Sequence, residues 1–298
     1  MTKIVKNFNS MHLKVRKSCY FILLTVVFSF CSNQQVEKNE KDNDAPLRVS
    51  VIGDSISTFR DYIPDGYNYH YPSKDGALVN VADTYWYRLI YKKMSNAMFD
   101  KNISLSSSTV TVNTEYSKDK HYYGRSFTER YITQGGVGKP DIVLIHGGTN
   151  DRGHNDYELF PGSGPCATAT APMEGDLDEV FAAGDVAKTL EQAKVLDASD
   201  FCSAYVKLIR MLQTQYPGVK IVCIIGDYIT VGIEQSTLEI AAHYGARCVN
   251  LLAVNGFNDQ TYMPKHDYNG TTGCHPGIQA MHFIADKIYD ELGEWLEN

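Results

Sequence analysis

A serine at the end of an apolar run is the first residue in the chain that could do chemistry. Ser55 follows the stretch 47–53, which is rich in apolar and β-branched residues and leads into Gly53-Asp54. This pattern predicts a parallel strand that ends in a tight turn. Ligands bind just beyond the carboxyl ends of strands in open α/β sheets, so Ser55 is well placed to be a nucleophile. A serine hydroxyl is a weak nucleophile unless a base and an oxyanion site converge on it.

Two other polar residues stand at comparable junctions. Asn150 follows the apolar run 141–147 and a glycine-rich turn, and His275 precedes Pro276 at the start of a helical pattern. The three residues therefore lie at the ends of predicted parallel strands or in the loops beyond them.

The elements that must position these residues alternate between strand and helix. Alternation with short connections predicts βαβ units and a mainly parallel sheet of about five strands, with helices on both faces. A long poorly patterned stretch, 152–197, is interpreted as a large cap or loop beside the site, with some helix near 185–195. Strands are predicted at 47–53, 102–110, 141–147, 219–226 and 246–251, and helices at 83–94 with Asp83 as N-cap, at 125–132, 199–215 and 234–244, and from Pro276 onward.

Three motifs in this order resemble those of the SGNH hydrolases of the GDSL lipase/esterase superfamily. They are Gly53-Asp54-Ser55, Gly148-Thr149-Asn150-Asp151 and His275-Pro276, and the resemblance covers roughly residues 47–295. The stretch from Ser55 to Pro64 is similar to that of a bacterial exported subgroup. The resemblance implies a three-layer flavodoxin-like α/β fold for a hydrolase domain over 47–298.

The resemblance also implies roles for individual residues. Ser55 would attack an ester carbonyl, and His275 would take its proton and later give it to the leaving alcohol. The oxyanion donors would be the backbone N–H of Ser55, a backbone N–H at Ser107 and the side-chain amide of Asn150. Asp54 and Asp151 are expected to hold loops. The mechanism requires no cofactor and no metal ion.

Two positions depart from the family pattern. The second motif usually offers a glycine where this chain has Ser107, and the last motif usually has an aspartate where this chain has Thr272. The residue that orients the imidazole is therefore open. Asp267, Asp259 or a main-chain carbonyl are the candidates, and Asp267 is the one we name.

An aromatic segment follows the serine. Residues 58–72 lack both helix and strand periodicity and contain prolines and glycine. Either the rings pin a loop to the domain, or they form a wall of the substrate site, with Tyr62, Tyr67 and Tyr69 as candidates for substrate binding. His146 is expected to be a packed or hydrogen-bonded histidine.

The amino terminus is expected to be a targeting segment. Basic residues precede a short apolar run that ends at Cys31, so residues 1–31 resemble a lipoprotein signal with Cys31 as the lipid attachment site, followed by a linker over 32–46. Ordinary secretion or an uncleaved anchor are the alternatives. The expected location is the cell envelope, with a membrane contact through the lipid.

Charge and cysteine content restrict the partners further. The net charge is −7 although residues 1–31 are purely basic, which argues against a nucleic-acid partner. Cysteines lack metal-ligand spacing; Cys223 and Cys248 are expected to be buried, and Cys166 and Cys202 are candidates for a disulfide.

The expected activity is that of a serine ester hydrolase acting on small acyl groups, with O-acetyl groups on carbohydrate as the favoured substrate. The alternatives are a lipase- or phospholipase-like acyl hydrolase and a surface glycan-binding lipoprotein without catalysis.

Overall fold

A five-stranded sheet forms the centre of the domain. The computed structural model describes residues 45–73, 78–112, 126–151, 176–226, 231–253 and 275–298. The strands are β1 (Leu47–Gly53), β2 (Ala97–Asn102), β3 (Ile142–Gly147), β4 (Lys220–Ile225) and β5 (Arg247–Asn250). Their order is β2-β1-β3-β4-β5, and all neighbouring pairs are parallel. This order is flavodoxin-like, which confirms the predicted α/β class.

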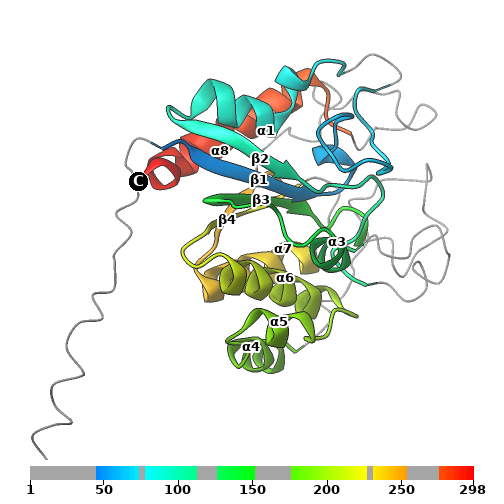
Figure 1. The fold of residues 1–298 in the computed structure, drawn as a ribbon, viewed down its shortest axis with the longest axis vertical. Coiled ribbons are helices and arrows are strands. Elements are labelled where there is room, and N and C mark those ends of the chain that lie inside the picture. Colours follow the sequence, from blue (N-terminus) through cyan, green and yellow to red (C-terminus); the bar gives the residue numbers. More distant parts are fainter. Residues whose placement is uncertain (1–44, 74–77, 113–125, 152–175, 227–230, 254–274) are drawn as a thin grey trace, which may run out of the picture. The chain divides into compact units, whose positions relative to one another are not determined.

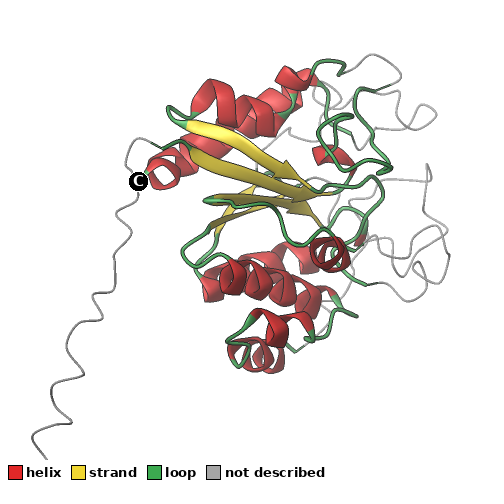
Figure 2. Cartoon of the chain, viewed as in Figure 1, coloured by secondary structure: helices red, strands yellow, loops and turns green. Residues whose placement is uncertain are grey.

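Helices cover both faces of the sheet (Figure 1, Figure 2). On one face α1 (Tyr85–Arg88), its π-helical continuation η3 (Leu89–Lys93) and α8 (Ile278–Glu297) share a core with the strands. The other face packs against α3 (Phe127–Thr133), α6 (Phe201–Gln215) and α7 (Val231–Tyr244). Helices α4 (Leu177–Asp185) and α5 (Leu190–Lys194) lie against α6, on its side away from the sheet (Figure 1).

The strand sequences explain this two-sided burial. Every residue of β3 is buried, with Leu144 facing the α8 side and Ile145 facing the α6 side. Each fully buried aliphatic side chain contributes about 1.5–3 kcal/mol, so a continuous apolar run suits a strand covered on both faces.

The position predicted for the second strand was wrong. The sequence analysis placed it at 102–110, but β2 spans Ala97–Asn102 and pairs with β1 alone. As an edge strand it is only partly buried and carries Asp100, whose carboxylate accepts hydrogen bonds from Arg48 and Ser50 of β1. The following residues still donate to β1 carbonyls through the N–H groups of Ile103 and Leu105, and then turn away.

Three helix predictions also need correction. Asp83 ends a 3-10 turn, η2 (Val81–Asp83), and the N-cap of α1 is Thr84. Helix α8 begins at Ile278 with Gly277 as N-cap, so Pro276 precedes the helix. Within 176–197 there are two helices, α5 near the expected position and α4, which the sequence analysis missed because proline and glycine dominate the stretch before it.

Several predictions concern residues outside the described ranges and stay predictions. They are the targeting segment with Cys31, the linker, Cys166, Asp259, Asp267 and Thr272. Cys202 and Cys223 are buried and Cys248 is partly buried. The suggested pairing of Cys202 with Cys166 stays a prediction. Among the helices of the described ranges, none has the length and apolar character needed to cross a membrane.

Candidate active site

Ser55 lies in a turn held mainly by backbone hydrogen bonds. It opens the 3-10 helix η1 (Ser55–Ser57) directly after β1, and the N-cap Asp54 accepts the Ile56 N–H through its side chain at 3.0 Å. The Asp54 N–H donates to the His146 carbonyl of β3 at 3.2 Å. Thr58 donates to the Ser55 carbonyl through its N–H and its hydroxyl, at 3.2 and 2.7 Å. Only 9% of the Ser55 surface is exposed, so its backbone is fixed and its hydroxyl lies in a confined site.

A buried arginine braces the strand that carries this turn. Arg130 of α3 is fully buried, and its guanidinium donates to the carbonyls of Gly53 and Ile103, each at 2.9 Å. It therefore joins the end of β1 to the chain that leaves β2. The sequence analysis assigned no role to Arg130, because nothing in a short helical pattern distinguishes a buried arginine from a solvated one.

His275 meets Ser55 just before α8 begins. Its Nε2 lies 2.9 Å from the Ser55 hydroxyl oxygen, and the residue is 6% exposed. Burial, and next the charge of His70, hold the pKa of His275 well below its usual value. A neutral imidazole at this distance accepts the serine proton, as a general base must.

A second histidine lies flat against the first. The ring of His70 stacks on that of His275 with centroids 3.6 Å apart and planes 9° apart. The sequence analysis weighed only the tyrosines of this loop, and no spacing rule could have shown that His70 meets a residue 205 positions later in the chain.

The candidate oxyanion residues lie on two connected loops. The Asn150 amide donates to the Ser108 carbonyl at 2.8 Å. The Asp151 carboxylate accepts the N–H groups of Val110 and Thr111, both at 2.9 Å, so it holds the loop after β2 against the turn after β3. Asp54 and Asp151 both fasten loops in this structure.

Ser107 has a left-handed backbone conformation, which suits glycine better than serine. Its φ is +61°, in the left-handed region where a Cβ costs about 1–2 kcal/mol. The chain therefore keeps the shape of this turn at some cost in strain, and the backbone N–H of Ser107 is retained.

The three tyrosines proposed for substrate binding have different surroundings. Tyr62 packs into an aromatic cluster with Trp86 at 5.4 Å and Phe99 at 5.7 Å between ring centroids, which fits the loop-pinning alternative. The Tyr67 hydroxyl accepts a hydrogen bond from Gln134, so it ties the loop to α3. Tyr69 is 43% exposed, and the Arg60 guanidinium lies over its ring.

His146 is buried in an apolar environment at the end of β3. It is fully buried beside the Tyr85 ring, and neither ring nitrogen has a hydrogen-bond partner within the described residues. Burial lowers its pKa to about 3, so the ring is neutral. The expected packed histidine is observed, without the hydrogen bond.

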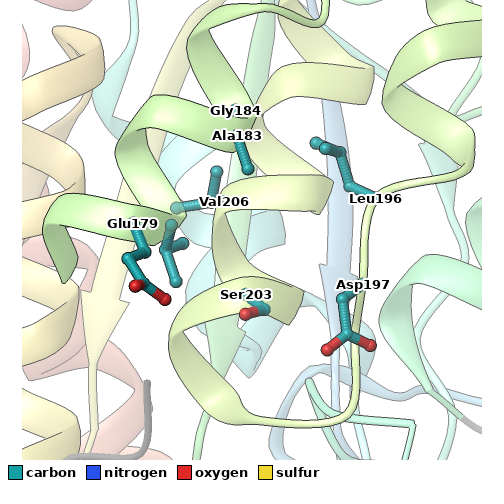
Figure 3. Close-up of a pocket in the computed structure, with 8 residues that line it drawn as sticks. Glu179, Ala183, Gly184, Leu196, Asp197, Ser203 and Val206 are labelled. Carbon is teal, nitrogen blue, oxygen red and sulfur yellow. The ribbon is translucent and has the colours of Figure 1, made fainter. Parts of the chain in front are cut away.

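A separate hollow lies between α4 and α6 (Figure 3). Apolar Val180, Leu196 and Val206 line it together with the carboxylate groups of Glu179 and Asp197. None of its lining residues is a histidine, so it offers no nucleophile–base pair like that of Ser55 and His275.

Comparison with known proteins supports the resemblance drawn from the motifs. Residues 47–156 match the family model for GDSL-like Lipase/Acylhydrolase. No curated protein matches the chain. The match and the fold together confirm the resemblance to the SGNH/GDSL hydrolase superfamily.

Solved structures share the fold at low sequence identity. Two proteins assigned as GDSL-like lipases, from Bacteroides uniformis and Bacteroides ovatus, are each 24% identical, with TM-scores of 0.56 and 0.57. The alignments cover 84% of this chain and 96% and 99% of theirs. A possible lipase from Chitinophaga pinensis is 16% identical, with a TM-score of 0.53 over 85% of this chain and 100% of that one.

Proposed function

We propose that the chain is a serine ester hydrolase that removes small acyl groups, O-acetyl groups above all, from carbohydrate. The observation that carries the proposal is the 2.9 Å contact between the Ser55 hydroxyl and Nε2 of a neutral, buried His275. The match of residues 47–156 to lipases and acylhydrolases supports the same reaction class.

The residues at the site are suited to acyl transfer in two steps. The Ser55 oxygen bonds to the ester carbonyl carbon while its proton passes to Nε2 of His275. The carbonyl oxygen becomes an oxyanion that the N–H groups of Ser55 and Ser107 and the Asn150 amide stabilise. The intermediate then expels the alcohol, which takes the proton from Nε2. Water repeats the sequence on the acyl-serine and releases the carboxylic acid.

The preference for a carbohydrate ester rests on the loop beside the base. Tyr69 is 43% exposed on the segment that also carries His70, and the Arg60 guanidinium lies over its ring, 5.8 Å from the centroid. An exposed tyrosine face suits stacking against a sugar ring. We also propose that the protein is exported and held at the cell envelope by a lipid on Cys31.

The decisive experiment compares p-nitrophenyl acetate, butyrate and palmitate as substrates for the wild type, Ser55→Ala and His275→Ala. We expect turnover of acetate by the wild type and a loss of about 10⁴–10⁶-fold in each variant, because nucleophile and base act as a unit. Ser95→Ala, a change at an exposed serine, serves as the matched control.

Other outcomes would point to the alternatives. Equal inactivity of wild type and Ser55→Ala would contradict catalysis and favour a glycan-binding protein. Preference for palmitate would favour a lipase. Release of acetate from acetylated xylan, abolished by Ser55→Ala, is the result expected for the proposed substrate class.

A further inference from the structure

The His70–His275 stack belongs to a closed ring of contacts around the candidate base. The His70 N–H donates to the Thr58 hydroxyl at 2.8 Å, and that hydroxyl donates to the Ser55 carbonyl at 2.7 Å. On the other side, the hydroxyl of the buried Tyr71 donates to the Pro276 carbonyl at 2.7 Å. The loop is thus fastened to the residues beside the nucleophile and beside the base.

The stacked ring of His70 restrains tilting of the His275 imidazole. A hydrogen bond to a nitrogen of the imidazole does not restrain that motion. A group bonded to a ring nitrogen fixes the direction of that edge, whereas a flat neighbour at 3.6 Å blocks tilting of the ring out of its plane. Tyr71 supports His70 from the side, with ring centroids 4.6 Å apart and planes 87° apart. His70 therefore cannot move away without disturbing a buried, hydrogen-bonded tyrosine.

We propose that His70 is a positioning residue for the base, which holds the His275 imidazole in the plane from which Nε2 faces the Ser55 hydroxyl. The proposal rests on the proposed function, since it assigns His70 a task in the same reaction. It also gives the aromatic loop after the nucleophile a role that the sequence did not reveal.

A second consequence concerns pH. Ser55 from η1 and His70 and Tyr71 from the loop lie against the His275 ring. Burial of the His275 ring, one face of which the stack covers, disfavours a proton on that ring, and the charge of His70 adds to the effect. Both effects lower the pKa of His275 and keep the base neutral as the medium becomes acidic.

The test uses His70→Ala and His70→Phe, with kcat, KM and the pH profile of kcat/KM for p-nitrophenyl acetate. In His70→Ala we expect kcat to fall about 10- to 100-fold with little change in KM, because the base loses its alignment. In His70→Phe a flat ring remains, so kcat recovers to within about threefold of wild type. In both variants the acid limb of the profile moves to higher pH, since the neighbouring charge is gone.

A control variant and a readout independent of turnover keep the test decisive. His243 also stacks flat on an aromatic ring, that of Phe181 at 4.0 Å, so His243→Ala removes a comparable stack on α7 and is expected to keep wild-type kinetics. The pKa of the His275 imidazole, followed by NMR, is expected to rise in His70→Phe even if the protein turns over no ester. That result would separate a failure of the proposed function from a failure of this inference.

Three results would overturn the positioning role. They are wild-type kcat in a folded His70→Ala, a loss of kcat that His70→Phe does not restore, and an unchanged pKa of His275 in both variants.

Discussion

Ser55 and His275 touch, but the protein holds them by different kinds of contact. The Ser55 turn is fixed by backbone hydrogen bonds and by the adjacent side chains of Asp54 and Thr58. Arg130 supports it by donating to the carbonyls of Gly53 and Ile103. His275 is held by a stacked ring and by a tyrosine hydroxyl on its neighbour Pro276, both from a loop about 200 residues earlier in the chain.

The difference indicates what can be changed at each end. The buried hydrogen bonds that fix the position of Ser55 are also part of the fold. Few side-chain replacements can therefore move Ser55 without also destabilising the protein. The base depends on side chains, so its orientation and pKa can be altered while the fold is kept. Substitutions of the residues that hold Ser55 in place should therefore act mainly on stability. Substitutions of the residues that hold His275 should act mainly on kinetics.

The largest effect on the Ser55 side is expected from Arg130→Met. The change removes the guanidinium donor from the buried carbonyls of Gly53 and Ile103, although the Gly53 carbonyl keeps its bond from the Leu105 N–H. We expect the free energy of unfolding to fall by about 2–4 kcal/mol. Urea unfolding measures the loss. The pKa of His275 in the folded variant should stay at its wild-type value.

Lys101→Met is a suitable control, because this partly buried lysine also donates to a backbone carbonyl, that of Gln134. A loss of unfolding free energy below about 1 kcal/mol in Arg130→Met would contradict the distinction between the contacts that hold Ser55 and those that hold His275.

A smaller effect is expected from His146→Leu, and it depends on pH. The pKa of His146 in the folded protein is about 3, below the 6.5 of an exposed histidine. Between these two pH values the unfolded chain therefore binds a proton at His146 that the folded chain does not bind. The stability contributed by neutral His146 is present above pH 6.5 and is lost as the pH falls toward 3. At pH 5 this costs the wild type about 2 kcal/mol, which the leucine variant should not lose.

Urea unfolding at pH 7.5 and pH 5 measures the difference, and His282→Gln, at a histidine paired with Asp83 on the surface of α8, is the control. An identical acid loss in wild type and His146→Leu would show that His146 is protonated or hydrated in the folded state.

The smallest effect is expected from Ser107→Gly. Glycine relieves the strain of a positive φ, and its greater freedom in the unfolded chain offsets most of the gain, so we expect about 0.5 kcal/mol of added stability. The backbone N–H remains, so kcat for p-nitrophenyl acetate should stay within about twofold. Thermal unfolding and kcat are the measurements, and a large loss of kcat would mean that the Ser107 side chain, rather than its N–H, serves the site.

The sequence predicts those parts of the fold that depend on local patterns. The continuous apolar run of β3, the Asp200 cap of α6 and the strand end before Ser55 each follow from a few neighbouring residues. The resemblance to the SGNH hydrolases, carried by three short motifs, then predicts that Ser55 and His275 meet. Local patterns do not predict the edge strand β2, because it is only partly buried and contains the charged Asp100, which accepts a hydrogen bond from Ser50 of β1.

The parts of the site that the sequence does not predict depend on contacts between distant segments. No local pattern shows that Arg130 is buried under β1 or that His70 lies flat on His275. Tyr62, which local reasoning offered as a substrate contact, lies in a ring cluster with Trp86 and Phe99. The tyrosines of this loop share one sequence context, and only packing distinguishes their roles.

The separation of 220 residues between Ser55 and His275 has a consequence for biosynthesis. A growing chain displays its nucleophile early, yet it holds no base until the segment at the start of α8 has been made and docked. A ribosome-bound chain therefore lacks the contact between Ser55 and His275 on which the proposed reaction depends. The Ser55–His275 pair can form only after the segment that begins α8 has been synthesised and has packed against the sheet.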